Sequence, residues 1–118
     1  MKHLRISTIM LAFLLIVPAI VQGNQEWIDT YVEVGQGKMH VWICGEGLPL
    51  LLLHGNTASG RWFTRLDIPD GYMAIAPDLP GFGESYRSGR YDIGLYAESI
   101  IELMDAMEIG SAIILGHS

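Results

Sequence analysis

Hydrophobic and polar residues alternate along two short segments near the start of the chain. Residues 30–34 and 38–44 alternate, and Gly35-Gln36-Gly37 separates them. The second segment has two faces: Met39, Val41 and Ile43 on one, and His40, Trp42 and Cys44 on the other. Two alternating segments joined by a glycine-rich turn are typical of an antiparallel hairpin.

Three later segments are apolar without alternation. Leu50–Leu53 are four consecutive leucines, residues 72–76 form a second apolar run, and residues 111–115 form a third. Continuous apolar strands are buried on both faces, as in a parallel sheet with helices on either side. We therefore expect inner strands of a parallel sheet here.

A helix is predicted between the last two of these strands. From Asp92 to Met107, apolar residues recur at spacings of three and four. The expected core face is Ile93, Tyr96 or Ala97, Ile100, Leu103 or Met104, and Met107. Asp92 is the candidate N-cap, and Gly110 follows the helix end. Because such a helix is a crossover, residues 73–76 and 112–115 should run parallel. A short helix is also expected around residues 61–66.

Residues 1–23 have the pattern of a secretory signal peptide. A basic start, Lys2 to Arg5, precedes an almost wholly apolar stretch at residues 6–21, and Val21-Gln22-Gly23 fits a cleavage site before Asn24. The apolar stretch is shorter than the roughly 20 residues that a spanning helix needs, which favours cleavage. We therefore expect a secreted or periplasmic protein, with an uncleaved membrane anchor as the alternative.

Composition narrows the class of protein that residues 24–118 form. The 118 residues suffice for one small domain, and half of them are apolar. Loss of residues 1–23 would remove two basic residues and no acidic ones, taking the formal net charge from −6 to −8. This acidity argues against binding to nucleic acid or to anionic membranes. Cys44 is the single cysteine, so it forms no internal disulfide, and we expect it to be buried and unreactive.

Three loops follow the predicted parallel strands, where ligands bind in open α/β sheets. They are residues 54–57 (His-Gly-Asn-Thr), residues 78–85 (Asp-Leu-Pro-Gly-Phe-Gly-Glu-Ser) and residues 116–118 (Gly-His-Ser). A buried strand that runs into Gly-x-Ser is the first half of a nucleophile elbow, a sharp turn that exposes a reactive serine. We expect Gly116 to lie where this turn leaves no room for a side chain.

With these loops in this order, the chain resembles the α/β-hydrolase fold superfamily over almost all of residues 24–118. Residues 50–56 are similar to its third strand and oxyanion loop, residues 78–85 to its D-x-x-G-x-G-x-S loop, and residues 116–118 to the start of G-x-S-x-G. The resemblance implies an α/β fold with eight mostly parallel strands and an antiparallel first hairpin, of which this chain would be the N-terminal part. It also implies a triad in the chain order serine, acid, histidine.

On this resemblance, Ser118 is the candidate nucleophile and Asn56 the candidate oxyanion-hole donor. A serine hydroxyl needs an adjacent base, which a histidine supplies while an acid orients it. Asn56 would act through its backbone N–H, with Thr57 as the alternative, and such donors are each worth about 3–4 kcal/mol. The triad acid and histidine are expected beyond Ser118, so the 118 residues alone are expected to be inactive.

The other polar residues of these loops are expected to be structural. His54 is expected to shape the oxyanion loop, and His117 has poor geometry as a base because it adjoins the nucleophile. His40 is expected to be structural or exposed. Asp78 precedes the elbow, so we expect it to bind backbone N–H groups rather than act as the triad acid. Three aromatic residues are candidates for an acyl pocket or for core and cap packing: Trp62, Phe63 and Phe82.

The leading hypothesis is a hydrolase that cleaves a small-molecule ester or related acyl substrate through Ser118, without a metal or organic cofactor. Carbon–carbon bond hydrolases, haloperoxidases, aminopeptidases and acyltransferases share the fold and stay open as alternatives. Dehalogenases and epoxide hydrolases normally use an aspartate nucleophile, which Ser118 disfavours. The second hypothesis is a truncated, non-catalytic hydrolase-like protein, and the uncovered apolar faces of such a chain argue against it.

Overall fold

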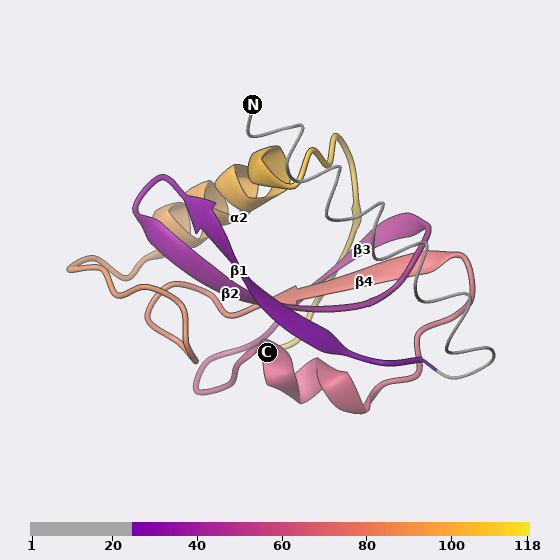
Figure 1. Ribbon diagram of the computed structural model, residues 1–118. Helices are drawn as coiled ribbons and strands as arrows, with labels where there is room; N and C mark the ends of the chain where they lie inside the picture. Colours follow the sequence, from indigo (N-terminus) through magenta and orange to yellow (C-terminus); the bar gives the residue numbers. More distant parts are fainter. Residues whose placement is uncertain (1–24) are drawn as a thin grey trace.

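The computed structural model describes residues 25–118 (Figure 1). The predicted signal peptide, residues 1–23, lies outside the described residues. Within residues 25–118, no helix has both the length and the apolar character needed to cross a membrane.

The antiparallel hairpin is present as predicted. Strand β1 (Ile28–Val34) pairs with β2 (Gly37–Gly45), and Tyr31 lies opposite His40. Successive side chains of a strand point to opposite faces. Accordingly, Met39, Val41 and Ile43 belong to one core cluster, and Cys44 belongs to the other.

The remaining strands form a mixed sheet with the hairpin. Strands β3 (Leu48–Leu53), β4 (Tyr72–Pro77) and β5 (Ile113–Gly116) extend it in the order β1-β2-β4-β3-β5. β3 pairs in parallel with both β4 and β5, so β4 and β5 run parallel as predicted, with β3 between them. β2 joins β4 in antiparallel pairing. The α/β class, with an antiparallel hairpin followed by parallel strands, is confirmed.

Apolar side chains pack on both faces of this sheet. Leu51 and Leu52 are neighbours in β3 and each is 1% exposed, yet they belong to different core clusters. Helix α2 (Ile93–Ala106) covers the first face, and the short 3-10 helix η1 (Gly60–Arg65) covers the second. Figure 1 shows the two helices on opposite sides of the sheet. A strand between two helix layers needs apolar residues at every position, which accounts for the run of leucines.

Cys44 lies in the second core cluster and is fully buried, as predicted. Burial raises the pKa of its thiol. Because the thiolate is the reactive form, this residue is inert at neutral pH.

Helix α2 begins where the sequence predicts, but its core face differs in the first turn. The carboxylate of Asp92 accepts the backbone N–H of Leu95 at 2.8 Å, as an N-cap does. Ile100 and Leu103 are buried as predicted, but Ile93 is 81% exposed and Leu95, at 1%, lies in the core instead. Ile93 is the first residue of the helix and lines a cavity at the end of the sheet rather than facing the strands.

The C-terminal end of α2 turns at Glu108 rather than at a glycine. Glu108 has a left-handed backbone, with φ 58°. The N–H of Ile109 donates to the carbonyl of Met104 at 2.8 Å, and the N–H of Glu108 donates to the carbonyl of Asp105 at 3.1 Å. These bonds form a Schellman motif, in which the left-handed residue is most often glycine. Gly110 comes two residues after that position.

Candidate functional site

The loops that follow β3 and β5 meet at the carboxyl ends of these strands. The N–H of His117 donates to the carbonyl of Leu53 at 2.9 Å, so the pairing of β3 with β5 continues past Gly116. A Cβ on Gly55 would lie 2.7 Å from the carbonyl carbon of Ser118 and 2.9 Å from its Cα. The oxyanion loop therefore lies directly against the backbone of Ser118.

Both candidate catalytic residues lie at this rim of the sheet. Ser118 is exposed and adjoins Gly55, and Asn56 is exposed and lines the same cavity as His117. Thr57, the alternative donor, has φ 61°, a left-handed conformation that is unusual for a β-branched residue. Backbone strain of this kind is typical of functional loops.

Residues 25–118 show no crowding at Gly116, and the expectation for the turn around Ser118 stays a prediction. A Cβ on Gly116 would meet no heavy atom of residues 25–118 within 4 Å. Among the described strands β5 pairs only with β3, and its four residues are exposed. The glycine that close approach requires is Gly55, on the opposite side of the contact.

His54 shapes the oxyanion loop, as predicted. The N–H of Leu79 donates to Nε2 of His54 at 3.0 Å, so Nε2 carries no proton and Nδ1 is the N–H donor. Nδ1 donates to the carbonyl oxygen of Gly55 at 2.8 Å. That carbonyl and the N–H of Asn56 belong to one planar peptide. The His54 bond therefore fixes the direction in which the Asn56 N–H points.

Asp78 binds backbone N–H groups of two loops, as predicted. Its side chain is 2% exposed. Oδ1 accepts the N–H of Gly60 at 2.7 Å, and Oδ2 accepts the N–H of Glu84 at 2.9 Å. One buried carboxylate thus holds the end of the oxyanion loop to the loop that follows β4.

His40 has contacts that the sequence analysis missed. It is 1% exposed, with Nδ1 2.9 Å from Oδ2 of Asp78 and Nε2 2.7 Å from Oδ2 of Asp29. Burial alone would lower the pKa of His40, but the hydrogen bonds to Asp29 and Asp78 and the charges of Asp78 and Glu84 raise it above its ordinary value. The alternating pattern placed His40 on one face of its strand. It could not predict the bond to Asp78, because Asp78 is 38 residues away in the sequence.

A cavity of about 390 Å³ lies beside the oxyanion loop. Its apolar lining is Leu53, Leu79, Phe82, Ile93 and Tyr96, and its polar lining includes His54, Asn56 and His117. The ring of Phe82 meets the ring of His54 edge-on, with 5.1 Å between centroids. Together with the exposed backbone of the loop, this lining can hold an uncharged, apolar group next to Ser118.

The three aromatic candidates, Trp62, Phe63 and Phe82, differ in whether they line the cavity or pack elsewhere. Phe82 lines the cavity, whereas Phe63 is 1% exposed and belongs to the core. Trp62 stacks on His117, with 4.4 Å between ring centroids and 23° between ring planes. Only Phe82 of the three therefore contributes to the wall beside the oxyanion loop in the described residues.

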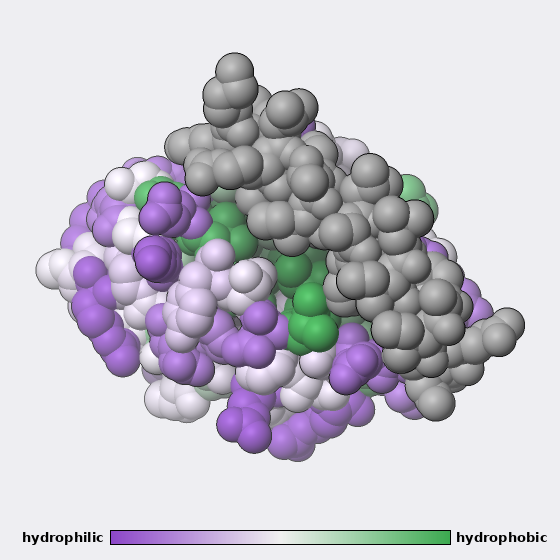
Figure 2. Space-filling model, viewed as in Figure 1, coloured by the Kyte–Doolittle hydropathy of each residue, from purple (hydrophilic) through white to green (hydrophobic). Residues whose placement is uncertain are grey.

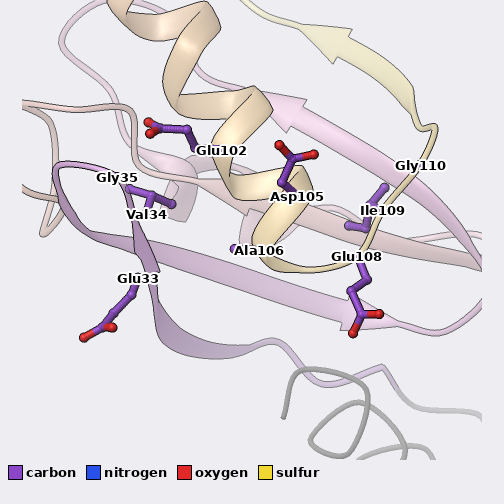
Figure 3. Close-up of a pocket in the computed structure, with 9 residues that line it drawn as sticks. All are labelled: Glu33, Val34, Gly35, Glu102, Asp105, Ala106, Glu108, Ile109 and Gly110. Atoms are coloured by element: carbon purple, nitrogen blue, oxygen red, sulfur yellow. The ribbon is translucent and has the colours of Figure 1, made fainter. Parts of the chain in front are cut away.

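A larger hollow of about 690 Å³ lies between the β1–β2 turn and the C-terminal end of α2 (Figure 3). The acidic residues Glu33, Glu102, Asp105 and Glu108 line it. In Figure 3 their carboxylates are spread around the hollow and do not converge. Within residues 25–118, no group of three or more His, Cys, Asp or Glu side chains is placed to hold a metal ion. None of the three predicted loops lines this hollow. Its larger volume therefore does not make it the candidate active site.

The amino-acid sequence is similar to that of proteins of known family. A family model described as the alpha/beta hydrolase fold matches residues 49–118. The chain is 39% identical over 109 residues to the magnesium-chelatase 30 kDa subunit of Rhodobacter capsulatus, a match that covers 86% of this chain and 38% of that protein.

Two solved structures are similar to this one. An epoxide hydrolase of Vigna radiata has a TM-score of 0.69 and 31% identity, covering 79% of this chain and 31% of that chain. A variant of an N-acyl homoserine lactonase, complexed with N-hexanoyl homoserine, has a TM-score of 0.69 and 33% identity, covering 75% of this chain and 35% of that chain. The chain spans about a third of the length of these three proteins.

Proposed function

Because the chain belongs to the α/β-hydrolase fold family, we propose that it carries the nucleophile and the oxyanion loop of a hydrolase that cleaves esters or related acyl compounds. The observation that carries the proposal is the contact between Gly55 and the backbone of Ser118. This contact brings an exposed serine hydroxyl next to a loop of backbone N–H groups. Acyl transfer requires this pairing, since charge develops on the carbonyl oxygen as the hydroxyl attacks the carbonyl carbon.

The proposed reaction proceeds in two halves. Oγ of Ser118 attacks the carbonyl carbon and passes its proton to a histidine base, which the proposal requires from beyond Ser118 together with the triad acid. The Asn56 N–H donates to the oxygen that becomes negatively charged, a contribution of about 3–4 kcal/mol for a donor of this kind. The alcohol leaves with the proton from the histidine, and water then releases the acid from the acyl-serine.

The lining of the 390 Å³ cavity supports an acyl group that is apolar and uncharged. None of the residues that line it, within the described chain, is Asp, Glu, Lys or Arg. Burial of an apolar chain against Phe82 and Ile93 would contribute roughly 25 cal/mol per Å² of surface removed from water. The similar lactonase, which was solved with N-hexanoyl homoserine, agrees with a substrate of this chemical class.

Serine at position 118 favours acyl chemistry over the epoxide opening of the similar Vigna radiata enzyme. A carboxylate that opens an epoxide forms an ester, which water can hydrolyse. A serine that opened an epoxide would form an ether, which water does not cleave at neutral pH. The enzyme would therefore be inactivated after one turnover. We also propose, from residues 1–23, that the protein is exported.

A fluorophosphonate probe tests the nucleophile in the full-length protein. This reagent phosphonylates a serine only where a base and an oxyanion hole activate it, so we expect labelling of the wild type and none of Ser118→Ala. Ser111→Ala is the matched control, because Ser111 is an exposed serine two residues before the start of β5, and it should label as the wild type does. Labelling of Ser118→Ala would show that the nucleophile lies elsewhere.

A further inference from the structure

His40 lies behind the oxyanion loop, between two carboxylates. Its Nδ1 is 2.9 Å from Oδ2 of Asp78, and its Nε2 is 2.7 Å from Oδ2 of Asp29. An ionised carboxylate accepts hydrogen bonds and donates none. With both carboxylates ionised, this geometry requires an N–H at each ring nitrogen, which is the imidazolium form of His40.

The titratable groups that face this ring are three carboxylates and the phenol of Tyr31, and the ring of Trp42 meets it edge-on. Asp29 and Tyr31 come from β1, Asp78 from the end of β4, and Glu84 from the loop that follows. Oε2 of Glu84 is 3.9 Å from Nε2 of His40, and the hydroxyl of Tyr31 donates to Glu84 at 3.0 Å. The protonated ring thus offsets the charge of a buried carboxylate and two more exposed ones.

Asp78 connects His40 to both ends of the oxyanion loop. At one end, Oδ1 of Asp78 accepts the N–H of Gly60 at 2.7 Å. At the other end, the residue after Asp78 is Leu79, whose N–H donates to His54 at 3.0 Å, and His54 in turn donates to the carbonyl of Gly55. The position of one aspartate therefore sets the backbone from residue 54 to residue 60.

We propose that His40, held as an imidazolium between Asp29 and Asp78, is a positioning residue for the oxyanion loop. When the ring loses its proton, Asp78 stays buried without a cationic partner, which is costly in a site of low dielectric. Asp78 then moves toward water, and the loop that presents the Asn56 N–H loosens. The proposal rests on the proposed function and adds a pH-dependent control of the same site.

The direction of the pH effect follows because it is the protonated form of His40 that bonds both Asp29 and Asp78. The pKa of His40 is raised because its hydrogen bonds and the nearby carboxylates outweigh the effect of burial. Positioning is therefore complete below the ordinary pKa of histidine and is lost as the pH rises through the raised pKa. The reactivity of Ser118 should show an alkaline limit for this reason, separate from any limit set by the triad histidine at lower pH.

The variant Asp29→Asn tests this link with little disturbance of the core. The side chain of Asp29 is 48% exposed, and an asparagine keeps an oxygen that can accept from Nε2 while removing the charge. In the full-length protein, we expect the alkaline limit of the fluorophosphonate labelling rate to move down by about one pH unit, with the rate at pH 6 unchanged. Glu33→Gln is the matched control, because Glu33 is on the same face of β1 and lies opposite Lys38 in the strand register, whereas Asp29 lies opposite Trp42. It should leave the limit in place.

The outcomes separate this proposal from the proposed function. If the profiles of Asp29→Asn and Glu33→Gln superimpose, the positioning role of His40 is overturned, and Ser118 stands as the nucleophile. If the wild type is not labelled at any pH, the proposed function fails, and amide hydrogen exchange decides the positioning role alone. We then expect Gly60 and Leu79 to exchange about tenfold faster in Asp29→Asn than in Glu33→Gln at pH 8, and equally at pH 6. Equal exchange at both values overturns it.

Discussion

Gly55 decides how closely the oxyanion loop approaches Ser118. A Cβ at position 55 would lie 2.7 Å from both the carbonyl oxygen of His117 and the carbonyl carbon of Ser118. Both are backbone atoms of the segment directly after β5, so neither can rotate away as the end of a side chain would. Any larger residue at this position must push the loop and the serine apart.

We therefore expect Gly55→Ala to slow fluorophosphonate labelling of the full-length protein by about 100-fold, because displacement of a catalytic group by about 1 Å has an effect of this size. The loop is exposed, so the fold should survive, and far-UV circular dichroism should match the wild type. Gly89→Ala is the control, since a Cβ there meets no described atom within 4 Å. A labelling rate equal to that of Gly89→Ala would contradict the importance of the contact.

These residues also show which parts of a site are predictable from sequence. His54 bonds the backbone of Gly55 and of Leu79 after the next strand, and Asp78 bonds the backbone of Glu84 in its own loop, and the order of the loops predicted both roles. His40 and Gly55 act through atoms that only the folded sheet brings near, Asp78 in one case and Ser118 in the other. Their roles therefore needed the structure.

At the scale of elements, α2 depends on its first turn. Asp92 accepts the N–H of Leu95 at 2.8 Å and also forms an ion pair with Arg90 at 2.6 Å. The hydrogen bond from Arg90 and that from the Leu95 N–H together lower the pKa of Asp92. Because the folded pKa is below the unfolded one, the contribution of Asp92 to stability is present above the ordinary pKa of aspartate and is lost as the pH falls through the lowered pKa.

Asp92→Ala should therefore lower the midpoint of thermal unfolding of the full-length protein by a few degrees at pH 7, and by less as the pH approaches 3. The control is Asp105→Ala in the last turn of the same helix, where a negative charge opposes the helix dipole and its removal should not destabilise. Calorimetry at several pH values measures both. An equal loss for Asp92→Ala at pH 7 and pH 3 would show that the carboxylate charge has no part in the cap.

Periodicity predicted the existence and length of α2 well, and its failure at Ile93 has a geometric cause. The spacing of apolar residues assigns one stripe to the core along the whole helix. The first turn of α2 extends past the end of the sheet, so Ile93 reaches the cavity beside the oxyanion loop, and Leu95 fills the core below it. An apolar residue at a helix start thus has two possible partners, and only the placement of the helix on the sheet selects between them.

At the scale of the molecule, the strand types were predictable and the strand order was not. Continuous and alternating apolar patterns distinguish the parallel strands from the hairpin, but they do not say that β4 lies between β2 and β3. Residues 111–115 have the continuous pattern of a buried strand, yet the four residues of β5 are exposed among the described residues. That order results from crossovers on both faces of the sheet, and it makes β5 the outermost of the described strands beside β3. Where the surface is not drawn in grey, Figure 2 shows a mostly hydrophilic face with an apolar area near its centre.

The edge at β5 has a consequence for the 118-residue polypeptide on its own. Ile113, Ile114 and Leu115 are 50%, 58% and 50% exposed on a strand that pairs only with β3 among the described strands. An apolar edge strand presents free backbone groups to other chains. We therefore expect this polypeptide to self-associate as its concentration rises. Size-exclusion chromatography with light scattering measures this association. Ile114→Lys should reduce the association, whereas Ile101→Lys, at a 59% exposed position on α2, should not. If both lysine variants associate equally, the contact lies on another surface, and if the unmodified polypeptide stays monomeric, the exposed strand is not a docking edge.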